Sequence, residues 1–409
     1  MGIIILFAWE RIILDNGLTV IYEQDTTFPV VSVQLWYRVG SAYEYPGITG
    51  ISHLLEHMMF RKTKNLDYGE YGERVRELGG EYNGATSYDY TFYYINIAKD
   101  RWEEALKLES ERMQNLVVDS ADFERERKVV LEEYLRGISN PLGKFYREFN
   151  YLLYLNHPYR HPIIGYRSDI ENISWREVYE HYEKFYSPFN AVLVIVGDVE
   201  RNEMLEAVKE YFGHIRKKPP GKIRIPEGEE GGERRMFIRE SVPYRKIAMG
   251  FPVPTRGDPD YTPCLLLSYI LSGERGYLKK HIKEFDVSAY LNRRKFKPAL
   301  IVTATFDEKI SYGHAESLIL TVLSSLPDSL TPRMLKRAKE KAITDIYSMS
   351  SSPFMRANFL GYLECTGHVE DGDTLLGQIE KTKIEDIKRV IEKYIKRERM
   401  AVLTMGREP

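Results

Sequence analysis

The most informative stretch of this sequence reads His53-Leu54-Leu55-Glu56-His57. On an α-helix, positions i, i+3 and i+4 share one face, so both imidazoles and the carboxylate project from the same side. Two neutral imidazoles one turn apart can bind one zinc ion, and the carboxylate can reach a water molecule beside that ion. The pattern therefore predicts a metal-dependent hydrolase in which His53 and His57 are metal ligands.

The residues around the motif favour a helix. An apolar run would bury the side opposite the histidines, and glycines precede the segment as loop residues. The alternative is a helix whose histidines and glutamate face solvent and bind nothing. With nine histidines in the chain, a chance match to H-x-x-E-H is expected at about the one per cent level.

A catalytic zinc site takes a third protein ligand and leaves one position for water. The candidates lie further along the chain in a strongly charged segment, residues 122–134, which is expected to form a helix with one apolar stripe. Glu126 and Glu133 are seven residues apart and share a face of that helix, whereas Glu132 lies about 100° around it from Glu133. Spacing alone does not choose between Glu132 and Glu133, and most glutamates on such a helix face solvent.

The inverted zinc motif, followed by Glu124-Arg125-Glu126-Arg127 and a later glutamate, resembles the pitrilysin/insulinase family of peptidases. The similarity is greatest to its short bacterial members, which resemble the mitochondrial processing peptidase. Further landmarks of the resemblance are residues 14–20, 40–44, 157–159 and 162–165. The resemblance implies one zinc ion per chain, bound by His53, His57 and Glu133. It also implies that Glu56 is the general base and that Glu126 orients a ligand histidine.

Residues 79–94 begin with a glycine turn and continue as an aromatic, β-rich stretch. By itself, this pattern is also typical of an ordinary core-facing hairpin. The resemblance implies that the segment contains an edge strand to which a peptide substrate adds by main-chain pairing. It assigns Asn83, Gly84 and Ala85 to substrate contact. Gly84 stands where the family often has alanine, which leaves the specificity open.

A polar segment rich in proline and glycine, residues 217–233, reads as a linker between two halves. It separates an expected N-terminal zinc-binding peptidase domain, residues 1–216, from a C-terminal domain without metal, residues 234–409. The halves look like a divergent repeat, because residues 192–197 and 401–406 match as terminal strands and residues 265–269 align with the motif. We therefore expect an α+β protein made of two homologous α/β-sandwich halves, each a mostly antiparallel sheet covered by helices.

The second half carries two further candidates. In the family, an arginine and a tyrosine seven residues apart bind the substrate backbone near the zinc ion, and the matching positions here are Lys283 and Tyr290. Tyr290 could donate a hydrogen bond to a developing oxyanion. Lysine does not replace arginine where a two-pronged contact is needed, and Lys283 is equally well explained as a surface charge.

Partners follow from the length of the chain. Its 409 residues correspond to half of the usual family chamber, so the resemblance implies a homodimer or a heterodimer with a zinc-free paralogue, acting on short or unfolded peptides. The net charge of −2 and the interspersed signs argue against nucleic-acid binding.

The expected location is the cytoplasm. No stretch is long enough to span a membrane, and residues 1–9 lack the basic region of a signal peptide. Cys264 and Cys365 do not form a disulfide framework, which fits a reducing compartment.

Three readings of the function compete. The first is a zinc endopeptidase of the processing-peptidase type, which hydrolyses peptide bonds with Glu56 as general base. The second is a non-catalytic assembly or peptide-binding subunit of a family heterodimer. The third is a metal- or peptide-binding module with incidental hydrolysis. His53, Glu56, His57 and Glu133 are all present, which favours the first reading.

Overall fold

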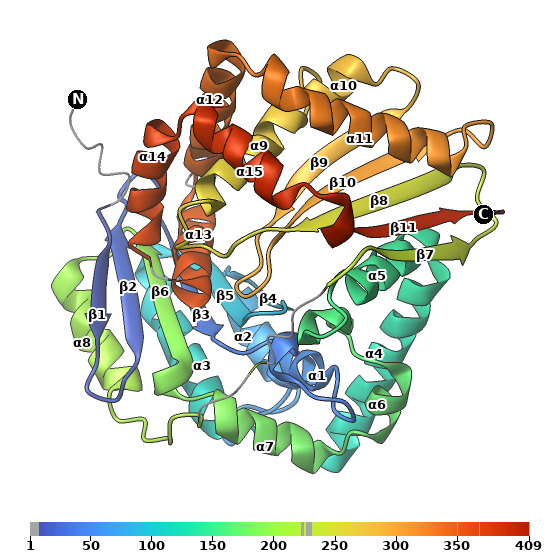
Figure 1. Cartoon of the computed structure of the whole chain (residues 1–409). Coiled ribbons are helices and arrows are strands. Elements are labelled where there is room, and N and C mark those ends of the chain that lie inside the picture. Colours follow the sequence, from blue (N-terminus) through green and yellow to red (C-terminus); the bar gives the residue numbers. More distant parts are fainter. Residues whose placement is uncertain (1–7, 222–224, 226–230, 350, 368, 409) are drawn as a thin grey trace. The chain divides into compact units, whose positions relative to one another are not determined.

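The computed structural model describes residues 8–221, 225, 231–349, 351–367 and 369–408. The chain divides into two compact units, each built around its own sheet (Figure 1). The first unit comprises residues 1–135, 161–225 and 349–373, and the second comprises 136–160, 226–348 and 374–409. The predicted α+β class with two mostly antiparallel sheets is confirmed.

The first unit contains a six-stranded sheet in the order β1-β2-β6-β3-β5-β4. Only the pair β2 and β6 is parallel, and the other neighbours are antiparallel. The strands are β1 Glu10–Ile13, β2 Thr19–Gln24, β3 Val30–Tyr37, β4 Glu81–Thr86, β5 Thr91–Ala98 and β6 Ala191–Gly197.

Helices cover both faces of this sheet. One face packs against a large apolar core to which α1, α3, α7 and α8 contribute, and the other face packs against α13. Every residue of β6 is buried, which explains why that strand is apolar throughout instead of alternating. The helices of this unit are α1 Ile51–Met58, α2 Glu70–Glu77, α3 Trp102–Asn115, α6 Arg167–Asn172, α7 Trp175–Phe185, α8 Arg201–Phe212 and α13 Pro353–Thr366, and α4 Ser120–Ser139 begins in it.

The second unit contains a five-stranded sheet in the order β7-β11-β8-β10-β9. Its single parallel pair is β7 and β11. Its strands are β7 Arg234–Arg239, β8 Arg245–Pro252, β9 Asp286–Asn292, β10 Ala299–Phe306 and β11 Ala401–Gly406. Its helices are α5 Pro141–Leu153, α9 Tyr261–Leu271, α10 Tyr277–His281, α11 Tyr312–Ser329, α12 Pro332–Ser348 and α15 Ile384–Tyr394, and most of α14 Asp371–Lys381 lies in it. Five short 3₁₀ turns complete the described chain, at Ser41–Tyr43, Lys99–Arg101, Pro158–Arg160, Pro188–Asn190 and Arg397–Arg399.

The two sheets share one topology. Strands β2-β6-β3-β5-β4 and β7-β11-β8-β10-β9 follow the same order, and the parallel pair stands at the same place in both. Helix α1, which carries the motif, follows β3, and α9 follows the equivalent strand β8. Residues 265–269, which align with the motif, lie inside α9. The topology therefore supports the predicted repeat.

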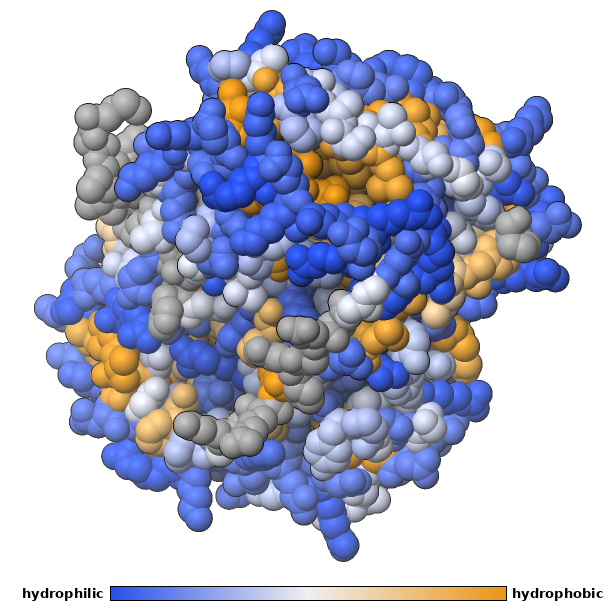
Figure 2. Space-filling model, in the orientation of Figure 1, coloured by the Kyte–Doolittle hydropathy of each residue, from blue (hydrophilic) through white to orange (hydrophobic). Residues whose placement is uncertain are grey.

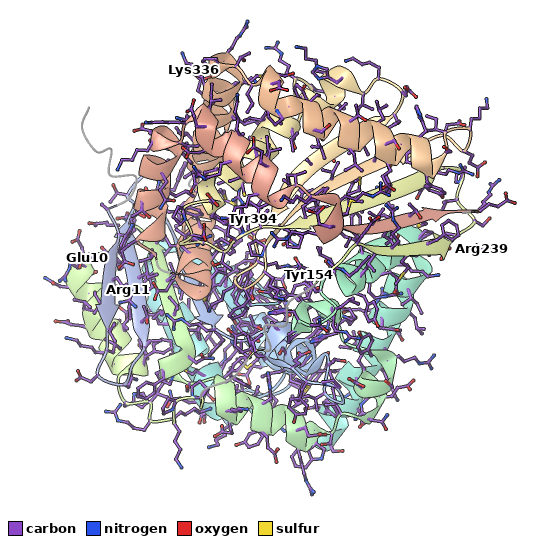
Figure 3. All side chains as sticks on the ribbon, viewed as in Figure 1. Glu10, Arg11, Tyr154, Arg239, Lys336 and Tyr394 are labelled. Atoms are coloured by element: carbon purple, nitrogen blue, oxygen red, sulfur yellow. The ribbon has the colours of Figure 1, made fainter. Side chains whose placement is uncertain are left out.

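Each unit includes a helix from the other half of the sequence. Helix α13 packs on β3 and β6 of the first sheet, and α5 packs on β7 and β11 of the second (Figure 1). The α13 residue Glu364 is buried and accepts hydrogen bonds from Arg11 at 2.9 Å and Arg38 at 2.8 Å (Arg11 is labelled in Figure 3). Each compact unit therefore contains residues from both halves of the sequence.

Two predictions fall partly on residues outside the described part. Residues 222–224 and 226–230 belong to the expected linker, and residues 1–7 belong to the N-terminal segment that is expected not to be a signal peptide. Within the described ranges, no helix is both long enough and apolar enough to cross a bilayer. On the face seen in Figure 2, hydrophilic residues predominate and hydrophobic residues form separate patches. Cys264 and Cys365 are both buried, and neither forms a disulfide bond.

Candidate active site

Helix α1 is held at its N-terminus by interactions that position the motif. It begins after Gly50, whose φ of 90° is left-handed, and a Cβ atom there would lie 2.3 Å from the carbonyl oxygen of Ile164. The buried carboxylate of Glu44 accepts hydrogen bonds from the backbone N–H groups of Gly50 at 2.7 Å and Ser52 at 2.9 Å. These bonds satisfy donors that a helix start leaves unpaired. Glycine and a carboxylate together fix where the first turn starts.

The fold brings His53, His57 and Glu133 together. Their ligand atoms all lie within 4.8 Å of one another, and among the described residues this is the group of histidine, cysteine and acidic side chains with metal-site geometry. The Glu133 Oε2 atom lies 3.8 Å from His53 Nε2 and 3.7 Å from His57 Nε2.

Glu132, which spacing could not distinguish from Glu133, is exposed and lies outside the group.

The donor set fits a zinc ion. The oxygen–nitrogen separations are too long for hydrogen bonds, but ligands placed about 2.0–2.2 Å from a shared tetrahedral ion are separated by comparable distances. Burial, with a contribution from His57, lowers the pKa of His53 to about 3, so this imidazole is neutral at pH 7 as a metal ligand must be. All three side chains keep partial exposure, which leaves room for water and substrate.

Glu126 supports the site from the interior of the first unit. Its Oε2 atom accepts a hydrogen bond from His57 Nδ1 at 3.3 Å, which directs the Nε2 lone pair of His57 towards Glu133. Arg61 Nη2 and the Tyr68 hydroxyl also donate to this carboxylate, both at 2.9 Å. Burial opposes ionisation of Glu126, but these three partners together lower its pKa below the ordinary value.

Glu56 faces the same region and is almost fully buried. Its Oε2 atom accepts a short hydrogen bond of 2.6 Å from the hydroxyl of Thr86, the last residue of β4. Burial raises the pKa of Glu56, and the hydrogen bond from Thr86 limits that increase. A carboxylate with a raised pKa next to a metal-binding cluster is suited to accept and return a proton near neutral pH.

Strand β4 carries the predicted substrate contacts and lies at the edge of the first sheet. Asn83 and Ala85 are exposed on one face, while Gly84 points to the other face, towards Phe60 and Tyr93. A Cβ atom at position 84 would lie 2.9 Å from the Tyr93 ring. Packing therefore explains the glycine at the position where alanine is frequent.

Lys283 and Tyr290 lie in the second unit. Lys283 is exposed in the segment between α10 and β9. Tyr290 lies on β9, the edge strand of the second sheet, and is 41% exposed. Their proposed contact with substrate stays a prediction.

Three residues of the site were missed from the sequence: Thr86, Arg61 and Tyr68. Each contacts Glu56 or Glu126 from another segment of the first unit. Arg61 carried a weak signal, since it stands four residues after His57 in the sequence, although α1 ends at Met58 and Arg61 lies in the turn that follows. Nothing in the local pattern distinguishes Thr86 or Tyr68 from their neighbours.

Two family models match the chain. The model described as "Insulinase (Peptidase family M16)" matches residues 19–146. This range includes the five residues of the candidate site on α1 and α4: His53, Glu56, His57, Glu126 and Glu133. The model described as "Peptidase M16 inactive domain" matches residues 172–342. The chain belongs to peptidase family M16. The resemblance stated from the motif is confirmed at the level of the family.

Relatives within M16 carry protease names. The chain is 28% identical over 401 residues to the zinc protease PqqE of Helicobacter pylori, a match that spans 95% of this chain and 90% of that protein. It is 28% identical over 261 residues to the mitochondrial-processing peptidase subunit beta of Bos taurus, covering 64% of this chain and 53% of that one.

A solved structure supports the same relationship. The crystal structure of a protease from Helicobacter pylori superposes with a TM-score of 0.92 at 26% identity, covering 98% of this chain and 100% of that one. The M16 chain described here is thus similar to zinc proteases over nearly its whole length.

Proposed function

We propose that this M16 protein is a zinc-dependent endopeptidase that hydrolyses short or unfolded peptides. The observation that carries the proposal is the convergence of His53, His57 and Glu133 beside Glu56 on the same helix as the histidines. Members that serve only as assembly subunits are expected to lose such residues, and here the full set is present and close together. The protease names of the relatives support the same conclusion.

His53, His57 and Glu133 would hold the ion, with Glu126 fixing the orientation of the His57 ring. Bound zinc supplies Lewis acidity, which polarises the scissile carbonyl and lowers the pKa of water. Glu56 accepts a proton from the attacking water at its free carboxylate oxygen and returns it to the departing nitrogen. The Thr86 hydroxyl, by donating to Glu56 Oε2, holds the carboxylate in one orientation during both transfers.

The substrate in this proposal adds to the free edge of β4 as an extended strand. Asn83, Gly84 and Ala85 would pair with it through their backbone, and the Thr86 end of the strand is beside Glu56. Lys283 and Tyr290 would contact the peptide backbone from the second half. Pairing with a second copy or with a zinc-free paralogue would complete the chamber.

The test compares the purified chain with its Glu56→Gln variant on a pool of quenched, unstructured peptides. Glutamine keeps the size of the side chain but cannot accept the proton, so we expect zinc content to be retained and turnover to fall by about 10²- to 10⁴-fold. Glu132→Gln, which changes an exposed glutamate next to Glu133, is the matched control and should keep wild-type rates.

Wild-type turnover by the Glu56→Gln variant would refute its role as base. If the wild-type chain alone cleaves nothing but zinc is bound, mixing with candidate zinc-free paralogues tests the heterodimer. Absence of both bound zinc and cleavage would favour a non-catalytic subunit instead.

A further inference from the structure

A pocket of about 490 Å³ lies in the first unit, at the end of β4 remote from Glu56. The start of β4, the adjoining ends of β3 and β5, and the first residues of α13 form its walls. Val30, Ser32, Glu81, Asn96, Pro353 and Phe354 are among its lining residues. No residue in the proposed chemistry contributes to it, so the catalytic site does not account for it.

The pocket lies on one particular face of the sheet. Along β4, Glu81, Asn83 and Ala85 are the exposed residues of one face, whereas Thr86 belongs to the opposite face, where it contacts Glu56. Glu81 pairs with Asn96 of β5, and cross-strand partners share a face. A peptide strand added to β4 alternates in the same way, so every second side chain would lie on the face of the pocket. From Thr86 to Glu81 the added strand would extend about 17 Å, or five residues.

Asn96 is an unsatisfied polar group in this pocket. Its side-chain Oδ1 atom is buried and, within the described residues, has no hydrogen-bond partner. Buried polar atoms in native proteins are rarely left without a partner, so Oδ1 of Asn96 leaves a hydrogen bond for a ligand, a water molecule or a shifted side chain to supply. A hydroxyl group can donate or accept, and therefore suits the amide in either of its two orientations.

The other walls favour an aromatic body. Phe354 contributes a ring, packed at 4.7 Å between centroids against Tyr94, and Val30 and Pro353 add apolar surface. Glu81 is the one charged residue among those that line the pocket, and it is exposed. Apart from Glu81 the lining is therefore neutral and mostly apolar. Its polar side chains are Asn96 and two serines, Ser32 and Ser352, whose hydroxyls already accept hydrogen bonds from Gln34 and the Met355 N–H. This combination matches a phenol better than an ammonium or a carboxylate.

We propose that this pocket is a distal specificity site, which binds a tyrosine side chain of the peptide substrate about five residues from the scissile bond. The tyrosine ring packs against Phe354 and Pro353, and its hydroxyl forms a hydrogen bond with Asn96. The inference rests on the proposed peptidase function and on strand addition to β4. It makes Asn96 a specificity-determining residue that acts through binding and not through the chemistry.

The experiment uses one quenched peptide that the wild-type chain cleaves, with tyrosine or phenylalanine placed in turn three to seven residues on either side of the scissile bond. At one position we expect tyrosine to be preferred by about 5- to 50-fold in kcat/KM, because phenylalanine would leave the Asn96 amide buried and unpaired. The difference should appear in KM, since the contact is the same in the ground state and the transition state.

Asn96→Leu should remove or reverse the preference for tyrosine. Asn96→Ser, which replaces the amide by a shorter side chain that can still form a hydrogen bond, should retain part of it. Tyr94→Phe, a neighbour on β5 that does not line the pocket, is the matched control and should leave the ratio unchanged. A thermal melt of each variant separates loss of folding from loss of specificity.

Cleavage with no difference between tyrosine and phenylalanine at any position would overturn the pocket proposal while leaving the peptidase intact. The pocket proposal is equally overturned if Asn96→Leu keeps the wild-type ratio. Failure of the wild-type chain to cleave any peptide in a zinc-dependent way, both alone and mixed with a zinc-free paralogue, would instead refute the proposed function, and this inference with it.

Discussion

Among single residues, Glu126 connects the proposed zinc ligands to the interior. It accepts hydrogen bonds from His57, Arg61 and Tyr68. In Glu126→Gln, one oxygen becomes an N–H₂ group that cannot accept, so His57 loses part of its support. We expect the zinc dissociation constant to rise by about 10- to 100-fold, measured by competition with a chromogenic chelator.

Glu132→Gln on the same helix is the control for that measurement, because Glu132 is exposed and outside the cluster. Equal zinc affinities of the two variants would show that Glu126 does not orient His57.

Among the helices, α13 depends on a glycine where it crosses the first sheet. A Cβ atom at Gly361 would lie 2.4 Å from the indole of Trp36, which is fully buried and stacked on Phe92. Gly361→Ala should therefore lower the free energy of unfolding by about 1–3 kcal/mol, although alanine is the better helix former. Urea denaturation measures the change.

Gly377→Ala in α14 is the matched comparison, since a Cβ atom there meets nothing within 4 Å. That substitution should stabilise by up to about 1 kcal/mol. If Gly361→Ala stabilised the protein to the same extent, the result would contradict the close contact between α13 and Trp36.

Helix α9, the counterpart of α1, is linked to α15 through the buried carboxylate of Asp260. It accepts hydrogen bonds from Arg389, Lys393 and Tyr394, each at 2.9 Å (Tyr394 is labelled in Figure 3). Burial opposes ionisation, but these partners together lower the pKa of Asp260. Because the pKa is lower in the folded than in the unfolded state, the carboxylate stabilises the fold above about pH 4, and this contribution is lost as the pH falls through the folded-state pKa.

Asp260→Asn should therefore cost about 1–2 kcal/mol at pH 7, a modest figure because both cations are about half exposed. The difference from wild type should shrink as the pH falls below about 4 in denaturation curves recorded across pH. A constant difference at every pH would contradict an ionised Asp260.

At the scale of the whole molecule, metal should couple to folding. A ligand that binds only the folded state stabilises it by about 2.7 kcal/mol when its free concentration is a hundred times Kd. Removal of zinc with a chelator should therefore abolish hydrolysis and lower the Tm by several degrees, and added zinc should restore both. The His57→Ala variant, which lacks a proposed zinc ligand, should have the same Tm with and without the chelator. A wild-type Tm that does not respond to the chelator would contradict zinc binding at this cluster.

Prediction from the sequence succeeded where the signal was local. The motif His53–His57 lies on one helix, α1, and the predicted terminal strands are β6 and β11. Both follow from periodicity, which depends only on neighbouring residues. The exchange of α5 and α13 between units could not be predicted in this way, because it depends on which apolar face packs on which sheet.

The sequence by itself determined which chemical groups are available, namely two imidazoles and a carboxylate on one helical face. It also determined that the α+β halves are repeated and that the histidines are replaced in the second half. Tertiary structure decided which distant groups meet them. It brings Glu133 and not Glu132 beside the histidines, and places Thr86 on Glu56 and Tyr68 on Glu126. Helical geometry fixes the directions of side chains within a turn, but contacts between segments depend on how whole elements pack.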